Sequence, residues 1–170
     1  FFYYITDKLT MIQAITETGF NIYVQTEDNR INTSVASTQI RHLVKFTNDL
    51  DKSVYYAYGN TELIKDRYTK INLAYGASPN IYTGVVKLFP AGYYKYEIYE
   101  VSWIGTVTVS SGNAPATEND VLSPVANDKG VVQGLVTKGK MNLSEKDGTQ
   151  QVQYVQREAA TETNYIYYGQ

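Results

Sequence analysis

Apolar and polar residues alternate with a period of two along most of this chain. The clearest example is residues 92–101, which read GYYKYEIYEV. Successive side chains of an extended strand point to opposite faces, so Tyr94, Tyr96 and Ile98 share one face and the charged residues between them share the other. This pattern predicts a β-strand with one largely apolar face.

Similar segments recur along the chain, and turn-forming residues separate them. We expect strands at residues 20–25, 40–47, 53–58, 67–75, 84–88, 93–102, 131–138, 140–144 and 150–156. Residues 61–66 (TELIKD) fit one helical turn, and residues 9–15 fit either a helical turn or a strand. About ten short strands with frequent turns predict an all-β fold, either a β-sandwich or a barrel-like single domain.

Two pairs of these strands are expected to form hairpins. Residues 40–47 and 53–58 are joined by an Asn- and Asp-rich turn, because these residues tolerate tight backbone conformations. Residues 84–88 and 93–102 are joined by a Phe-Pro-Ala-Gly tip.

Residues 105–130 differ from the rest of the chain, because they are rich in Gly, Pro and Asn and contain few large apolar residues. An unstructured connection of roughly 25 residues is rare inside a compact domain and is usually functional or disordered. We expect an arm that lies over a neighbouring subunit or over the surface of the domain itself. The predicted organisation is one domain, residues 1–170, with a strand-rich body at 20–104, this extended arm, and returning strands with a tail at 131–170.

The composition narrows the set of partners and cofactors. The net charge is −2, which gives no attraction to nucleic acid or to an anionic membrane, so neither partner is expected. The chain has no cysteine and one histidine, which excludes disulfides, thiolate metal sites and a multi-histidine site within one chain. No apolar run approaches the roughly 20 residues that span a bilayer, and no cofactor or metal site is expected.

One segment has the spacing of a phosphate-binding loop. Residues 134–140 read GLVTKGK. Met141 follows, so no hydroxyl can hold magnesium, and the context is strand–turn–strand where a phosphate loop needs a strand leading into a helix. The sequence favours a tight turn at Gly139.

Candidate catalytic and metal-binding residues have structural explanations of their own. His42 shares a face with Val44 and Phe46, and no nucleophile or acid is spaced to work with it, so a structural role is favoured. Glu97 and Glu100 lie on opposite faces of one strand and cannot form a glycosidase pair. No catalytic residue is predicted and an enzyme is not expected, although a pocket that gathered His42 with carboxylates would favour one.

Two pairs of carboxylates, Asp49 with Asp51 and Glu118 with Asp120, have a spacing that can contribute to calcium binding. Neither pair continues into the acidic 12-residue loop with a central glycine that calcium sites use. Solvated carboxylates in turns are the favoured interpretation, and no metal ligand is assigned.

The chain contains 17 tyrosines, and several strands carry them on both faces. A sheet with one wet face does not need that arrangement. The second face therefore packs on a second sheet or meets another chain, where tyrosine is enriched. Trp103 lies where the clearest strand ends and the arm begins, and it fits either core packing or an interface.

Four segments taken together resemble a known class of protein. They are residues 42–58 with an FTND turn, 67–75 beginning RY, 88–103 with GYYKYEIYE, and 136–141 with a late GK. In this order they resemble small virion structural proteins of tailed bacteriophages, in particular capsid auxiliary, or decoration, proteins. The resemblance covers roughly residues 39–143.

The resemblance implies a non-enzymatic virion structural protein, made in the bacterial host cytoplasm, that binds the exterior of the capsid. Its expected partners are the major capsid protein lattice and copies of itself, so it is expected to be oligomeric in the particle. We expect the interface to include Trp103, Asn113, Pro115, Val121, Leu122, Tyr3, Tyr4, Tyr165 and Tyr167. The alternative is a carbohydrate-binding module of a phage head fibre or tail fibre, for which the tyrosines would form an open platform.

Overall fold

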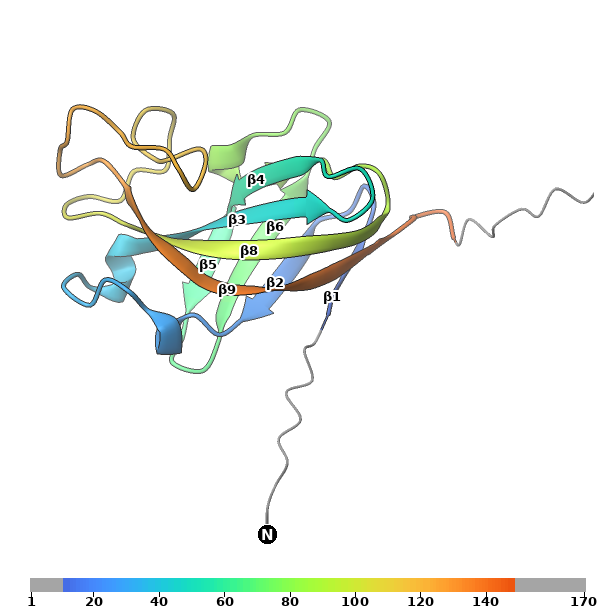
Figure 1. Ribbon diagram of the computed structural model, residues 1–170, viewed down its shortest axis with the longest axis horizontal. Coiled ribbons are helices and arrows are strands. Elements are labelled where there is room, and N and C mark those ends of the chain that lie inside the picture. Colours follow the sequence, from blue (N-terminus) through green and yellow to red (C-terminus); the bar gives the residue numbers. More distant parts are fainter. Residues whose placement is uncertain (1–10, 149–170) are drawn as a thin grey trace, which may run out of the picture.

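The structure, a computed structural model, describes residues 11–148 of the chain. These residues form two β-sheets that lie face to face (Figure 1). The larger sheet contains, in spatial order, β1 (Ile12–Ile15), β9 (Val131–Ser144), β8 (Gly92–Ser102), β3 (Ile40–Asn48) and β4 (Val54–Tyr58). The smaller sheet contains β2 (Phe20–Val24), β6 (Thr69–Tyr75) and β5 (Thr61–Ile64), with β7 (Val85–Val86) also paired to β6.

The prediction of an all-β fold is confirmed. Within the described residues the two sheets form a sandwich and do not close into a barrel. Short 3-10 turns interrupt the connections at Glu27–Asn29 (η1), Ser37–Gln39 (η2) and Ile81–Thr83 (η3). The strand expected at 150–156 lies outside the described residues.

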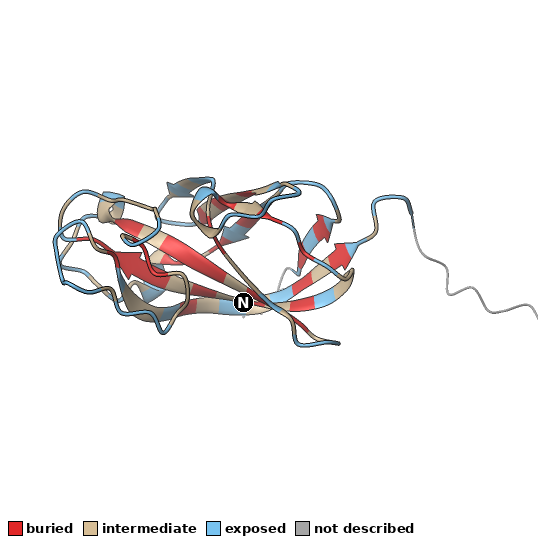
Figure 2. Ribbon diagram, turned by 90° about the horizontal axis from the view of Figure 1, so that it is seen from above, coloured by how far each residue is buried: buried red, intermediate tan, exposed pale blue. Residues whose placement is uncertain are grey.

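The interior of the sandwich is built from the apolar faces that the alternation predicted. Tyr94, Tyr96 and Ile98 of β8 are buried, and they meet the fully buried Ile22 and Ile71 of the smaller sheet in one core. Figure 2 shows the buried positions of the two sheets facing each other across the interior. Full burial of one such side chain contributes about 1.5–3 kcal/mol, so this core is the main source of stability.

The strand order is that of an immunoglobulin-type sandwich. In that fold one sheet contains strands B, E and D, and the other contains G, F and C, with C′ added in the variable type. Here β2–β6–β5 take the places of B, E and D, and β9–β8–β3–β4 take those of G, F, C and C′. The arm is therefore the connection between the last two strands of the fold, and it lies at one end of the sandwich.

A tyrosine at the start of β8 supports this assignment. The hydroxyl of Tyr94 donates a hydrogen bond to the carbonyl oxygen of Pro90 at 2.6 Å. Immunoglobulin-type sandwiches have a tyrosine at the start of strand F that bonds back to the backbone in this way. Burial raises the pKa of Tyr94 to about 12, so the hydroxyl keeps its proton for this bond at neutral pH.

The helical turn expected at residues 61–66 is wrong. Thr61–Ile64 is strand β5, which pairs with β6 in the antiparallel direction. Leu63 points outward, whereas the Glu62 side chain is 3% exposed because it reaches His42 inside the sandwich. A polar residue at an inward position hid the period of two in the sequence.

The hairpin expected from residues 84–88 and 93–102 is also wrong. Val85 and Val86 pair in parallel with Ala74 and Tyr75 of β6, and β8 pairs with β3 and β9. Gly84 has a φ of 70°, and a Cβ at this position would lie 2.2 Å from the backbone nitrogen of Asn60. The chain thus turns tightly at Gly84, against the β4–β5 connection, and this turn directs β7 to the smaller sheet.

The turn expected at Gly139 is wrong too, because β9 is one strand from Val131 to Ser144 that pairs with the whole length of β8, with two register shifts in the N-terminal part of β9, away from Gly139. Gly139 lies opposite Tyr96, and a Cβ there would be 2.5 Å from the tyrosine hydroxyl oxygen. The glycine therefore makes room for the ring. The segment 134–140 lies inside one strand, which excludes the phosphate-loop geometry.

For the described part of residues 9–15, the first described strand decides between the helical turn and the strand. Ile12–Ile15 is β1, and it pairs in parallel with Met141–Ser144 of β9 at the edge of the larger sheet. Ile12 and Ala14 are buried, and Ile15 is exposed. The alternation of a strand is therefore present in these four residues.

Candidate functional site

The arm, residues 105–130, folds back onto the outer face of the larger sheet. Ala114 of the arm is buried in a second apolar core with Leu43, Tyr58 and Trp103. The arm was expected to lie either over a neighbouring subunit or over its own domain, and it lies over its own domain. The second tyrosine-bearing face at this end of β3, β4 and β8 is therefore covered by the same chain.

Hydrogen bonds hold the arm in place at both of its ends. The Trp103 Nε1 donates to the carbonyl oxygen of Asp128 at 3.1 Å. The backbone N–H of Gly130 donates to the backbone carbonyl oxygen of Asn113 at 2.8 Å. Lys129 Nζ donates to Asn113 Oδ1 at 2.7 Å. In its centre the Tyr58 hydroxyl donates to the carbonyl oxygen of Pro115 at 2.6 Å. The arm is thus an ordered loop with a defined surface.

A small charged cluster adds a further attachment. Glu118 accepts hydrogen bonds from Lys45 on β3 and from the Tyr56 hydroxyl on β4. Burial and the bond to Glu118 raise the pKa of Tyr56 to about 12. The bond to Glu118 also raises the pKa of Lys45. Burial alone would raise the pKa of Glu118, but the hydrogen bonds from Lys45 and Tyr56 lower that pKa overall. At neutral pH the cluster is an ion pair that fastens the arm to the sheet.

This cluster corrects one interpretation of the carboxylates, because Glu118 lies in a turn but its side chain is only 15% exposed and accepts two hydrogen bonds instead of being solvated. Asp51 and Asp120, by contrast, are exposed. Asp51 accepts from the Ser53 hydroxyl, and Asp120 accepts from Thr117 and Ala116. Among residues 11–148 no group of three or more His, Asp or Glu side chains is arranged to hold a metal ion.

His42 joins the two sheets. Its Nδ1 contacts Glu62 Oε1 of β5, and the two side chains are 2% and 3% exposed. Glu100 lies opposite His42 on β8, and its carboxylate accepts the backbone N–H groups of Ile31 and Asn32 at 3.0 and 2.8 Å. The carboxylates near His42 are therefore closed off from solvent between the sheets, which supports the structural role expected for this residue.

Sequence reasoning did not connect Glu62 or Glu100 with His42. Glu100 sits at an inward position of β8, a detectable signal of a buried carboxylate. Glu62 lies on a segment interpreted as a helical turn, so its inward direction was not visible.

Two residues expected at the interface are buried by the arm itself. Trp103 is 0% exposed, and Pro115 is also buried. The indole packs so closely on Gly130 that a Cβ there would lie 2.6 Å from Trp103 Cζ2. The core-packing interpretation of Trp103 is confirmed, and neither residue offers a surface to another chain.

The other expected contact residues differ among themselves. Asn113 and Leu122 are half-buried, whereas Val121 is 89% exposed. Four of the expected residues lie outside the described residues: Tyr3, Tyr4, Tyr165 and Tyr167.

Further apolar residues are exposed at the same end of the sandwich. Val125 of the arm is 84% exposed, and Ile104, which precedes the arm, is 70% exposed. Gln39 Nε2 donates to the carbonyl oxygen of Ile104 at 2.7 Å, which connects the β2–β3 loop to the base of the arm. Figure 1 shows the arm and this loop at one end of the two sheets. We call Ile104, Val121 and Val125 the exposed apolar residues of the loop end.

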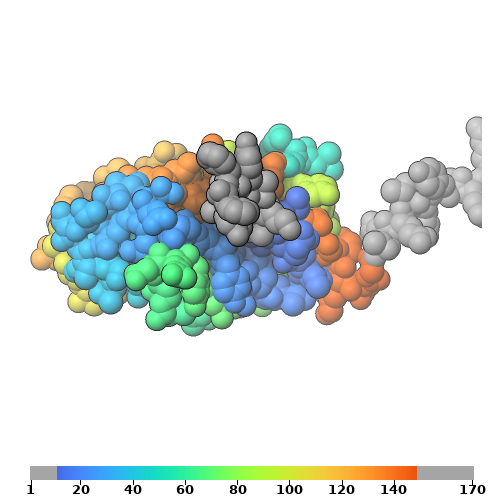
Figure 3. Space-filling view, turned by 90° about the horizontal axis from the view of Figure 1, so that it is seen from below, coloured from blue at the N-terminus to red at the C-terminus, as the bar shows by residue number. Residues whose placement is uncertain are grey.

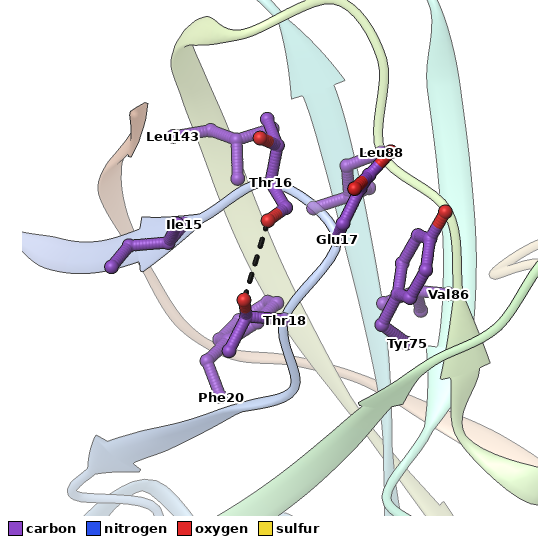
Figure 4. A pocket seen from close by; sticks show the side chains of 9 residues that line it. All are labelled: Ile15, Thr16, Glu17, Thr18, Phe20, Tyr75, Val86, Leu88 and Leu143. Atoms are coloured by element: carbon purple, nitrogen blue, oxygen red, sulfur yellow. Dashed lines mark hydrogen bonds between the residues drawn. The ribbon is translucent and has the colours of Figure 1, made fainter. Parts of the chain in front are cut away.

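Two concave features of the described surface are small. One lies between the two sheets near the β1–β2 turn, is lined by residues such as Phe20, Tyr75 and Leu143, and has a volume of about 10 Å³ (Figure 4). An adjacent one, lined by Lys87, Phe89 and others, measures about 180 Å³. Sites for small molecules are typically about 300–1,000 Å³, so each of these two hollows is smaller than such a site.

Comparisons with known proteins give no match: no family model matches the chain, and no curated protein or solved structure is significantly similar to it. Within residues 11–148 no helix has the length and hydrophobicity needed to cross a bilayer. The immunoglobulin-type strand order describes topology alone, because such sandwiches carry many unrelated functions. Function is therefore argued from the surfaces.

Proposed function

We propose that this protein is a non-enzymatic virion structural protein that binds the capsid surface of a tailed bacteriophage and decorates or stabilises it. The observation that carries the proposal is the presence of highly exposed apolar side chains, Ile104, Val121 and Val125, on or beside a loop held by internal hydrogen bonds. The resemblance of residues 39–143 to capsid auxiliary proteins supplies the identity of the partner.

An ordered loop is suited to this task for an energetic reason. Binding costs free energy when loops and side chains must be ordered, and a loop that is already fixed avoids much of that cost. Bonds from Trp103, Tyr58 and Lys45 fix the arm before any partner arrives. Apolar side chains that remain exposed on such a loop are available to be buried by a partner.

The proposed partners are the major capsid protein lattice and other copies of this chain. A lattice presents the same site many times, so a modest interface per copy is sufficient when each bound copy adds stability by mass action. The protein would therefore act on the capsid exterior and be present in many copies per particle.

Binding to purified capsids that lack the protein tests the proposal. The double variant Val121→Asp/Val125→Asp places two charges at the loop end and is expected to weaken co-sedimentation with capsids at least 10-fold. Leu50→Asp is the matched control, since Leu50 is 87% exposed but lies in the β3–β4 turn at the other end of β3. Equal binding by the double variant, or a copy number of only a few per particle, would contradict the proposal.

A further inference from the structure

The outer face of the smaller sheet is a flat surface with an ordered set of side chains. Two rows of directly paired residues cross its three strands, one consisting of Tyr23, Lys70 and Leu63 and the other of Asn21, Asn72 and Thr61. Their sequence neighbours Ile22 and Ile71 are fully buried, so these six positions point away from the core. Figure 3 shows the β5–β6 turn, in green, beside the segment that contains β2, in blue.

The first row is apolar and aromatic. Tyr23 is 58% exposed and Leu63 is 43% exposed. Tyr68, in the β5–β6 turn, extends this row, because its ring centroid lies 6.2 Å from that of Tyr23 and it is 41% exposed. Lys70 Nζ lies 5.9 Å from the centre of the Tyr23 ring, within cation–π range. The row therefore combines two accessible aromatic rings with one fixed positive charge.

The second row is neutral and hydrogen-bonding. Asn72 Nδ2 donates to Asn21 Oδ1 at 2.9 Å. This bond orients the two side-chain amides. It leaves the side-chain Nδ2 of Asn21 as a donor and the side-chain Oδ1 of Asn72 as an acceptor, with the Thr61 hydroxyl beside them. Three adjacent strands span roughly 10 Å, which is the scale of one or two pyranose rings.

We propose that this face binds an acidic saccharide, that is, a glycan chain bearing carboxylates. A pyranose ring has an apolar C–H face and an edge of hydroxyls that both donate and accept hydrogen bonds. The C–H face packs on Tyr23 and Tyr68, and the hydroxyls bond to the Asn21–Asn72 pair. The carboxylate pairs with Lys70, which is the only charged residue among the six outward positions.

A second copy of this chain is a poorer occupant of the same face. In a two-fold contact this surface of one copy would face the same surface of the other. The six outward positions of the surface contain one lysine and no carboxylate. The two Lys70 ammonium groups would then be desolvated without an acidic partner on these strands. An acidic glycan supplies the missing charge. The proposal does not depend on lattice binding, which uses the loop end.

The saccharide proposal is tested by calorimetric titration of the full chain with two probes: a galacturonate hexamer and a glucose hexamer. We expect the acidic hexamer to bind and Tyr23→Ala to weaken that binding at least 10-fold. Lys70→Gln should reduce the preference for the acidic over the neutral hexamer to about onefold. Tyr93→Ala is the matched control, because Tyr93 is 56% exposed on the outer face of the larger sheet.

The proposal is overturned if neither hexamer binds, if Tyr23→Ala binds as well as the wild-type chain, or if Lys70→Gln keeps the acidic preference. It is also overturned if Tyr23→Ala turns a sedimenting dimer into a monomer and leaves saccharide binding unchanged. Melting temperatures of all variants within a few degrees of the wild type show that the fold is retained. Capsid binding by Tyr23→Ala should be normal, which separates this surface from the loop end.

Discussion

Trp103 and Asp128 are 25 residues apart in sequence, and the indole Nε1 of Trp103 donates a hydrogen bond to the backbone carbonyl of Asp128 at 3.1 Å. This bond closes the arm at its base and keeps the indole beneath it. The arm is consequently part of the packed domain, and its outer surface alone is available to a partner.

Trp103→Ala should strongly destabilise the protein. The indole is fully buried in the second core, and replacing a buried tryptophan by alanine typically costs about 3–5 kcal/mol. Circular dichroism during urea denaturation measures the effect, because the variant lacks the only tryptophan. Tyr93→Ala, at an exposed position, should change the free energy of unfolding little. A change below about 1 kcal/mol for Trp103→Ala would show that the arm packs loosely.

Gly139→Ala should destabilise the pairing of β8 with β9. The new Cβ would lie 2.5 Å from the hydroxyl oxygen and 2.7 Å from Cζ of Tyr96, so the ring must move within a packed core. Overpacking of this kind costs about 1–3 kcal/mol. A double-mutant cycle with Tyr96→Leu, measured by thermal unfolding, should recover part of the loss. Additive effects of the two changes would contradict this account.

Breaking one side of the His42–Glu62 pair should cost more than replacing both partners. Glu62→Leu leaves His42 buried without its carboxylate, and removing one partner of a buried pair typically costs about 3–5 kcal/mol. The double variant His42→Leu/Glu62→Leu should lie much closer to the wild type, since apolar residues of similar size fit between the sheets. Chemical denaturation of the three variants gives the comparison, and a double variant worse than the single one would refute it.

The Lys45–Glu118 cluster should make stability depend on pH on the acid side. Burial alone raises the pKa of Glu118, but the bonds from Lys45 and Tyr56 lower it below its ordinary value of 4.5. A carboxyl with a lowered folded-state pKa stabilises the fold above the unfolded pKa, and the stabilisation is lost as the pH falls through the folded pKa. The destabilisation caused by Glu118→Gln should therefore be full at neutral pH and shrink on acidification below about pH 4.5.

Urea denaturation at stepped pH measures this difference between the wild-type chain and Glu118→Gln. Glu17→Gln is the control, because the Glu17 side chain is 59% exposed and, within residues 11–148, its ion pair is with the exposed Lys146. We expect the control to follow the wild-type curve. Parallel curves for Glu118→Gln and the wild type would mean that the cluster does not hold the arm.

The long strands were predictable because their information is local. The alternation in β3 and β8 assigns Val44, Phe46 and Ile98 to the inner face whatever they pack against, and the structure buries all three. The short strands were less predictable. β5 and β7 have few residues and depend on partners for their conformation, so their sequences do not identify β6 as the neighbour that both share.

The candidate surfaces were predictable only in part. Val121 was expected as a contact residue and is exposed, whereas Trp103 and Pro115 turn inward because the arm folds over the sheet. The exposure of a side chain in a loop depends on the surface against which the loop packs. The amino-acid composition of the loop does not determine that surface. The six outward residues of the smaller sheet were not recognised as one set, because β5 was interpreted as a helical turn.

By itself, the amino-acid sequence determined the all-β class, the strands with clear alternation and the apolar face of each. Only the tertiary structure decided how the strands pair, that the arm seals a second core, and that His42 meets Glu62 across the two sheets. The physical reason is range: a period of two is a property of neighbouring residues and follows from strand geometry. Strand pairing, the packing of the arm on the sheet and the burial of side chains depend on contacts between residues far apart in the chain. These contacts form only when the two sheets pack.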